Sequence, residues 1–194
     1  GMKYEEGYYR VEMRRVVIHD ILPEEVEVEE EDGLIAMYLF DETELRQYIQ
    51  ENKDQKLVAG LVYIDNYEEA LEGVEEVRRP LLTALVDRKV NKYMQNIDAI
   101  VKKIEKDKFL VVFQQKYLQQ LQATKFALLD EVRSINIGNE IAVTLSIGLG
   151  VNAPTYIQAY DAARVAIDLA LGRGGDQAVV KDGEQIYYYG GKSQ

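Results

Sequence analysis

The chain has 194 residues, of which 47% are hydrophobic, and a formal net charge of −11. This hydrophobic content is enough to form a packed core, and the acidic charge argues against binding to nucleic acid or to an anionic membrane, since phosphates would be repelled. There is no cysteine and one histidine, His19, which excludes disulfides and Cys-ligated zinc and argues against multi-histidine metal sites and Ser-His-Asp catalysis. No apolar run approaches the roughly 20 residues that cross a bilayer as a helix.

The first 40 residues contain two β-prone runs, residues 8–18 and 34–40, on either side of an acidic stretch, residues 24–32. Two strands bury little apolar surface by themselves and are marginally stable alone. We therefore expect them to be the last strands of a larger domain.

A helix is predicted from about Glu42 to Lys53. Asp41 precedes it as an N-cap, where its carboxylate accepts hydrogen bonds from N–H groups of the first turn, and Glu44 follows three residues later. A strand that ends in Asp-x-Thr-Glu and continues into a helix resembles the C-terminal edge of a PAS sensor domain with its signalling linker. An ordinary N-cap is the alternative.

A nearly continuous apolar run, residues 57–64, predicts a buried central strand. Apolar residues at helical spacing then predict a helix over about residues 74–93. Pro80 lies inside this pattern, so it either breaks the helix near Arg79 or marks its true first turn.

The rest of the chain alternates strand and helix patterns. The expected elements are a hairpin over 100–113, a helix over 117–135, a strand over 141–149, a helix from Pro154 to Leu171, and a second hairpin formed by 177–181 and 185–189 around Asp182-Gly183. From Leu57 onward the order is β-α-α-β-β-α-β-α-β-β. This order predicts an α/β (α+β) sandwich with a mostly antiparallel central sheet.

The tip of the first hairpin reads Glu105-Lys106-Asp107-Lys108-Phe109. With the later Thr-Leu-Ser-Ile-Gly strand and a helix that ends in a glycine-rich turn, it resembles a GGDEF domain, the nucleotidyl-cyclase-like fold of diguanylate cyclases. The tip occupies the place of that family's Gly-Gly-Asp/Glu-Glu-Phe signature. Only the acid at Asp107 and the aromatic at Phe109 remain, so the signature is degenerate.

Other positions of the cyclase site also differ on this resemblance. Tyr63 replaces the first metal-binding Asp, while Asp65 matches the second, and a neutral phenol cannot replace a carboxylate as a Mg²⁺ ligand. Glu68 replaces a Lys, and Leu171 and Gly175 replace the Lys and Arg that contact phosphates. The inhibitory Arg-x-x-Asp is also absent from residues 96–99. We therefore do not expect diguanylate synthesis.

The residues at these positions also have ordinary structural interpretations. Asp107 is a common turn former, Asp65 before Asn66 is a common helix N-cap, and Lys106 and Lys108 are typical solvated charges. The run from Gly174 to Asp176 reads as a turn.

The pattern of loss is similar to that of GdpP/YybT-type cyclic-di-AMP phosphodiesterases, and the resemblance covers essentially the whole chain. It is carried by residues 62–67, 107–109, 145–150, 172–181 and 188–193, most specifically by Gly-Arg-Gly-Gly-Asp-Gln-Ala and the closing Gly-Gly-Lys-Ser. The resemblance implies a membrane-anchored bacterial protein with a PAS-like sensor, a modified GGDEF domain and a DHH phosphodiesterase domain. Residues 1–41 would be the end of the PAS-like domain, 42–55 a linker helix and 56–194 the degenerate GGDEF domain, on the cytoplasmic side.

This resemblance implies a regulatory signalling domain that works beside PAS and DHH phosphodiesterase domains of the same parent chain. The sequence contains none of the Asp/His-rich motifs of the hydrolase domain, so cleavage of cyclic-di-AMP is not expected from these residues. Two alternatives stay open: a weak Mg-dependent ATPase with Asp65 and Asp107 as nucleotide or metal-binding residues, or a dimerisation module without a ligand. Haem, associated with the family's PAS domain, is not expected from so short a PAS piece.

Overall fold

The computed structural model describes residues 1–16 and 34–190. His19, the acidic stretch 24–32 and the closing Gly-Lys-Ser lie outside the described residues. The chain divides into two compact units, Gly1–Asn52 and Lys53–Gln194.

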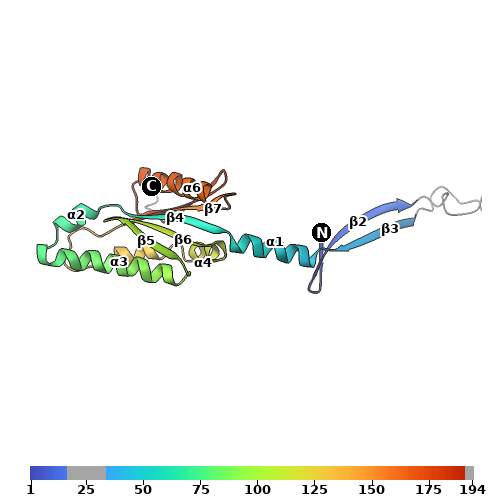
Figure 1. Cartoon of the computed structure of the whole chain (residues 1–194), viewed down its shortest axis with the longest axis horizontal. Helices are drawn as coiled ribbons and strands as arrows, with labels where there is room; N and C mark the ends of the chain where they lie inside the picture. The colour runs from blue at the N-terminus through green and yellow to red at the C-terminus, as the bar shows by residue number, and fades with distance from the viewer. Residues whose placement is uncertain (17–33, 191–194) are drawn as a thin grey trace, which may run out of the picture. The chain divides into compact units, whose positions relative to one another are not determined.

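The first unit is a three-stranded antiparallel sheet followed by a helix, of which residues 53–55 are counted with the second unit (Figure 1). Its strands are β1 (Met2–Tyr4), β2 (Gly7–Val16) and β3 (Leu34–Asp41), and the helix is α1 (Thr43–Gln55). The two β-prone runs thus form the paired strands β2 and β3, and β1 is a third strand that the sequence pattern did not predict.

Asp41 helps to start α1, as its sequence position suggests. Its Oδ1 accepts the Thr43 N–H at 2.9 Å and the Thr43 hydroxyl at 2.6 Å. These bonds, above all the hydroxyl, lower the pKa of Asp41 below its usual value. The next residue, Glu42, pairs with Arg10 of β2, with 2.9 Å between Glu42 Oε1 and Arg10 Nε.

The second unit is built around a six-stranded sheet in the order β5-β6-β4-β7-β8-β9. Neighbouring strands are antiparallel except for β7 and β8, which are parallel because α6 crosses over between them. The predicted α/β sandwich with a mostly antiparallel sheet is therefore confirmed. The strands are β4 (Leu57–Ile64), β5 (Ile100–Glu105), β6 (Lys108–Gln114), β7 (Leu145–Val151), β8 (Gln177–Asp182) and β9 (Gln185–Gly190).

Helices cover both faces of this sheet, and Figure 1 shows α6 (Tyr156–Gly172) on one face and α3 (Arg79–Gln95) and α4 (Leu118–Ala123) on the other. The central strand β4 has to be apolar on both sides. Its Val58 and Val62 join the core on the α3 side, whereas Leu61 packs under α6. This double burial explains the unbroken apolar run in the sequence.

The backbone of α6 lies directly on β7. A Cβ at Gly148 would meet backbone atoms of Ala163 and Ile167, and one at Gly150 would overlap the Ala159 carbonyl oxygen. Only glycine permits so close an approach. The helix begins at Tyr156, two residues after Pro154, because the Thr155 hydroxyl accepts the Gln158 N–H at 3.2 Å as its cap.

The helix predicted over 74–93 begins later than expected. A short helix α2 (Tyr67–Glu72) and a 3₁₀ turn (Glu76–Arg78) precede α3 (Arg79–Gln95). Pro80 lies in the first turn of α3, where its missing N–H breaks no hydrogen bond. Of the two interpretations of Pro80, the first-turn position is correct.

The single helix predicted over 117–135 is wrong. The segment contains a 3₁₀ turn (Gln115–Tyr117), α4, and α5 (Leu128–Arg133). Between α4 and α5, Lys125 and Phe126 have φ values of +50° and +56°, which no helix accepts. The break buries Phe126, which is 1% exposed and packs 5.1 Å from the Tyr189 ring.

The strand predicted over 141–149 is shifted, since β7 begins at Leu145 and ends at Val151. In the described parts of the chain, no helix is both long and apolar enough to cross a membrane.

Candidate functional site

Asp65 follows directly after β4 and is half-buried. Its Oδ1 accepts the hydroxyl of Ser146 on β7 at 2.6 Å, and its Oδ2 accepts the backbone N–H of Asp176 at 2.8 Å. It does not cap α2, because the residue at that cap is Asn66, which makes no side-chain cap bond. The N-cap interpretation of Asp65 is therefore wrong, and the carboxylate instead joins β4, β7 and the turn before β8.

The turn between α6 and β8 is shaped around this carboxylate. Gly174, Gly175 and Asp176 have φ values of +99°, +73° and +55°, as expected for a tight turn. A Cβ on Gly175 would come within 2.7 Å of Asp65 Cγ. Gly175, which the resemblance matches to a phosphate-binding Arg of the cyclase family, thus contacts Asp65.

Asp176 extends the hydrogen-bonded network to α5. Arg133 donates to its carboxylate through Nη2 at 2.7 Å and Nε at 3.1 Å, and donates through Nη1 to Asp130 at 2.5 Å. Hydrogen bonding to Asp176 raises the pKa of Arg133 above its usual value. The network therefore runs from Ser146 through Asp65 and Asp176 to Arg133.

The tip of the β5–β6 hairpin lies beside the end of β4. The Ile64 N–H donates to the carbonyl oxygen of Asp107 at 2.8 Å, so the structure brings Asp107 and Asp65 to the same end of that strand. The two lysines of the tip are paired, since Lys106 donates to Glu68 of α2 and Lys108 to Glu105 at 2.9 Å.

The signature aromatic and the tyrosine of β4 have structural partners. Phe109 is 1% exposed in the core, with Lys103 Nζ 5.4 Å from its ring centroid. Tyr63 is half-buried under Lys108, whose Nζ lies 5.3 Å from the Tyr63 ring centroid. Burial raises the pKa of Tyr63, so at neutral pH its hydroxyl is protonated and offers no anionic oxygen to a metal.

Asp65 and Asp107 are the two carboxylates that were predicted to hold a divalent metal. In the described part of the chain, no three or more His, Cys, Asp or Glu side chains gather closely enough to hold a metal ion. Both oxygens of Asp65 already accept protein hydrogen bonds. The roles of Asp65 and Asp107 in binding nucleotide or Mg²⁺ therefore stay predictions.

Sequence reasoning missed three members of this network: Ser146, Asp176 and Arg133. Ser146 is fully buried in an otherwise apolar strand, and a buried hydroxyl requires a hydrogen-bond partner, which was a usable signal. Asp176 was predicted only as part of a turn. Nothing in the sequence around Arg133 points to Asp176, which lies 43 residues away.

The sheet order and the hairpin beside the end of β4 define a GGDEF-type domain. The active GGEEF domain of a diguanylate cyclase from Vibrio cholerae superimposes with a TM-score of 0.54 at 11% identity, covering 71% of this chain and 89% of that one. At this identity the likeness shows the fold alone.

Sequence comparison gives the family. Residues 62–187 match the family described as "Cyclic-di-AMP phosphodiesterase GdpP-like, GGDEF domain", and the chain belongs to it. The cyclic-di-AMP phosphodiesterase GdpP of Geobacillus thermodenitrificans is 33% identical over 158 residues, and the phosphodiesterase PdeA of Listeria monocytogenes is 35% identical over 158 residues. Each match covers 81% of this chain but 24% of the relative, so the chain spans about a quarter of their length.

Proposed function

We propose that this domain is a regulatory signalling domain of a GdpP-type cyclic-di-AMP phosphodiesterase and does not synthesise cyclic-di-GMP. One observation carries the proposal: polar side chains at the cyclase positions already have partners within the domain. Lys106 pairs with Glu68, and Asp65 is taken by Ser146 and the Asp176 N–H. A group of polar side chains that satisfy each other is suited to holding a conformation rather than to turning over a substrate.

In this proposal, residues 1–41 are the end of a PAS-like sensor, α1 belongs to the linker helix of residues 42–55, and residues 56–194 form the modified GGDEF domain. The domain would lie on the cytoplasmic side of a membrane-anchored parent protein, between a sensor and a phosphodiesterase domain. The names of the relatives and their greater length support the part of this proposal that places a phosphodiesterase domain in the parent protein.

The first test is synthesis. The purified chain, incubated with GTP and Mg²⁺ beside an active diguanylate cyclase as positive control, is expected to form no cyclic-di-GMP. Product formed by this chain, and lost on Asp107→Ala, would overturn the proposal.

The second test addresses regulation and uses the complete coding sequence. Ser146→Ala breaks the network inside this domain and is expected to change the rate of cyclic-di-AMP hydrolysis. Gln185→Ala, at an exposed position of β9, is the control and should leave the rate unchanged. Equal rates for the parent and for Ser146→Ala, with the domain shown to be destabilised, would argue against a regulatory role.

Nucleotide titration separates the two alternatives from this proposal. A dimerisation module without a ligand predicts no heat on addition of ATP, GTP or cyclic dinucleotides, so a clear micromolar isotherm excludes it. A weak Mg-dependent ATPase predicts phosphate release that falls in both Asp65→Ala and Asp107→Ala. Release that persists unchanged in both variants indicates a contaminant.

A further inference from the structure

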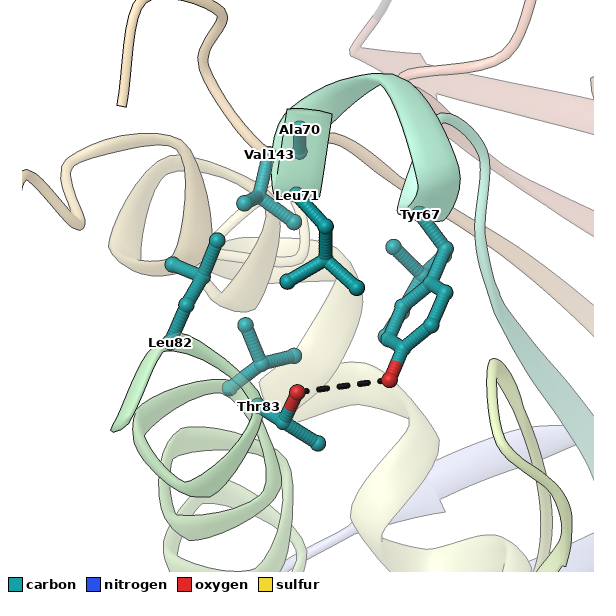
Figure 2. Close-up of a pocket in the computed structure, with 8 residues that line it drawn as sticks. Tyr67, Ala70, Leu71, Leu82, Thr83 and Val143 are labelled. Carbon is teal, nitrogen blue, oxygen red and sulfur yellow. Dashed lines mark hydrogen bonds between the residues drawn. The ribbon is translucent and has the colours of Figure 1, made fainter. Parts of the chain in front are cut away.

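A small cavity lies between α2 and α3. Its volume is about 10 Å³, room for one water at most, and its walls are almost entirely apolar. Figure 2 shows Tyr67 and Leu71 of α2 pointing toward Leu82 and Thr83 of α3, with Val143 closing another side. The α2–α3 contact is therefore incompletely packed, and separation of the two helices forfeits less contact there than in a filled core.

Two contacts hold Tyr67 over this cavity. Its hydroxyl lies 3.3 Å from the Thr83 Oγ1, the bond drawn in Figure 2. Lys106 of the hairpin tip places its Nζ 5.5 Å from the Tyr67 ring centroid and donates to Glu68, the next residue of α2. We call the contacts of Lys106 with Tyr67 and Glu68 the Lys106 bridge.

The start of α2 is fixed independently of the Lys106 bridge. The Asn66 side chain donates to the Ala142 carbonyl at 2.8 Å and accepts the Thr144 N–H at 3.1 Å. The helix beyond it has only six residues. A movement of α2 away from α3 would therefore pivot at Asn66, and the Lys106 bridge joins the moving part to the hairpin.

We propose that the Lys106 bridge keeps the cavity between α2 and α3 closed, and that α2 swings outward and opens the cavity when Lys106 leaves Glu68. The Lys106 and Glu68 side chains are 61% and 63% exposed, so the pair is open to salt and to competing ions. Exposed ion pairs and cation–π contacts are individually weak. Loss of the Lys106 bridge should therefore raise the fraction of molecules with an open cavity by a modest factor.

The absence of cysteine from the chain allows a direct measurement. Val143→Cys places a single thiol in the cavity wall, where the parent side chain is 2% exposed. Its reaction rate with a disulfide reagent under native conditions reports how often the cavity opens. Adding Lys106→Met removes the charge but keeps the stem, and is expected to raise this rate about two- to tenfold.

Two matched controls isolate the Lys106 bridge. Lys108→Met removes the same charge from the same hairpin, but Lys108 pairs with Glu105 and lies over Tyr63 rather than over α2, so the rate should stay within about twofold. Val179→Cys places the thiol in β8, fully buried and away from the cavity, and its rate should be insensitive to Lys106→Met. If Val143→Cys does not fold, Ala70→Cys in the same wall replaces it.

Salt gives an independent readout. Raising NaCl from about 0.05 M to about 0.5 M should accelerate labelling of the Val143→Cys thiol when Lys106 is present and have no effect beside Lys106→Met. Equal rates in Lys106→Met and Lys108→Met, or equal acceleration of the Val143→Cys and Val179→Cys thiols, would overturn the proposal. The second outcome would mean that the whole domain had been destabilised.

Discussion

The carboxylate of Asp65 lies against Gly175, so closely that a Cβ on Gly175 would sit 2.7 Å from Asp65 Cγ and Oδ2. Gly175 also has a φ of +73°, where a side chain is strained in any case. On the sequence resemblance, both positions were assigned to the substrate site of a cyclase, and in this chain the two residues contact each other. Substitutions at the two positions test this contact directly.

Gly175→Ala should destabilise the domain by about 3 kcal/mol or more, because it adds a clash with Asp65 to the cost of a left-handed residue. Gly174→Ala is the matched control. Its φ is +99°, but nothing lies within 4 Å of its Cβ position, so only the backbone cost of about 1–2 kcal/mol is expected. Urea unfolding measures both.

In a chain that already carries Asp65→Ala, the clash is gone. Gly175→Ala should then cost no more than Gly174→Ala. The double-mutant cycle would then show a coupling of about 1–2 kcal/mol between the two positions. Additive costs would contradict the close contact.

Ser146→Ala should cost about 1.5–3 kcal/mol, since Ser146 is fully buried and donates to a carboxylate. Ser134→Ala removes an exposed hydroxyl bonded to the Glu131 carbonyl and should change the free energy of unfolding by no more than about 0.5 kcal/mol. Similar costs for the two serines would mean that the Ser146–Asp65 bond contributes little.

Lys125→Gly should stabilise the domain by about 0.5–1 kcal/mol, because the exposed Lys125 has a φ of +50° and glycine relieves that strain at some cost in unfolded-state entropy. The same substitution at exposed Lys92 of α3 should destabilise by about 1 kcal/mol. Thermal unfolding of the two variants should therefore shift in opposite directions.

Asp41 should titrate below its usual value of 3.8, because the Thr43 hydroxyl and N–H favour the ionised form. Because the pKa is lowered in the folded state, ionised Asp41 stabilises the fold above pH 3.8. This stabilisation is lost as the pH falls through the folded-state pKa. Thr43→Ala removes the hydroxyl and should move the pKa of Asp41 upward, as followed by NMR. An unchanged pKa would mean that the hydroxyl bond does not form.

The large elements could be predicted because each had a clear pattern. The apolar run 57–64 gave β4, and the hairpins at 100–113 and 177–189 gave β5–β6 and β8–β9. The helix over 117–135 failed for a physical reason. Its residues fit a helical pattern, but burial of Phe126 against Tyr189 favours a left-handed break that no local pattern reports.

The degenerate site could be predicted residue by residue but not as an arrangement. The sequence shows that Glu68 and Lys106 both depart from the cyclase pattern, and it takes the fold to show that these two changes form an ion pair. Likewise, the replacement at Gly175 and the retained acid at Asp65 look unrelated in the sequence. The fold brings the two residues into contact. Long-range pairing of this kind has no local periodicity from which to infer it.

The glycines of β7 have a mechanical consequence. At Gly148 and Gly150, backbone meets backbone, with no side-chain layer between strand and helix that could deform or repack. The β7–α6 pair should therefore behave as one incompressible body, with β7 amides that exchange with solvent only on global unfolding. A conformational signal that passes through this domain is therefore expected to travel along the opposite face of the sheet, where α2, α4 and α5 have six residues each and the packing includes a void.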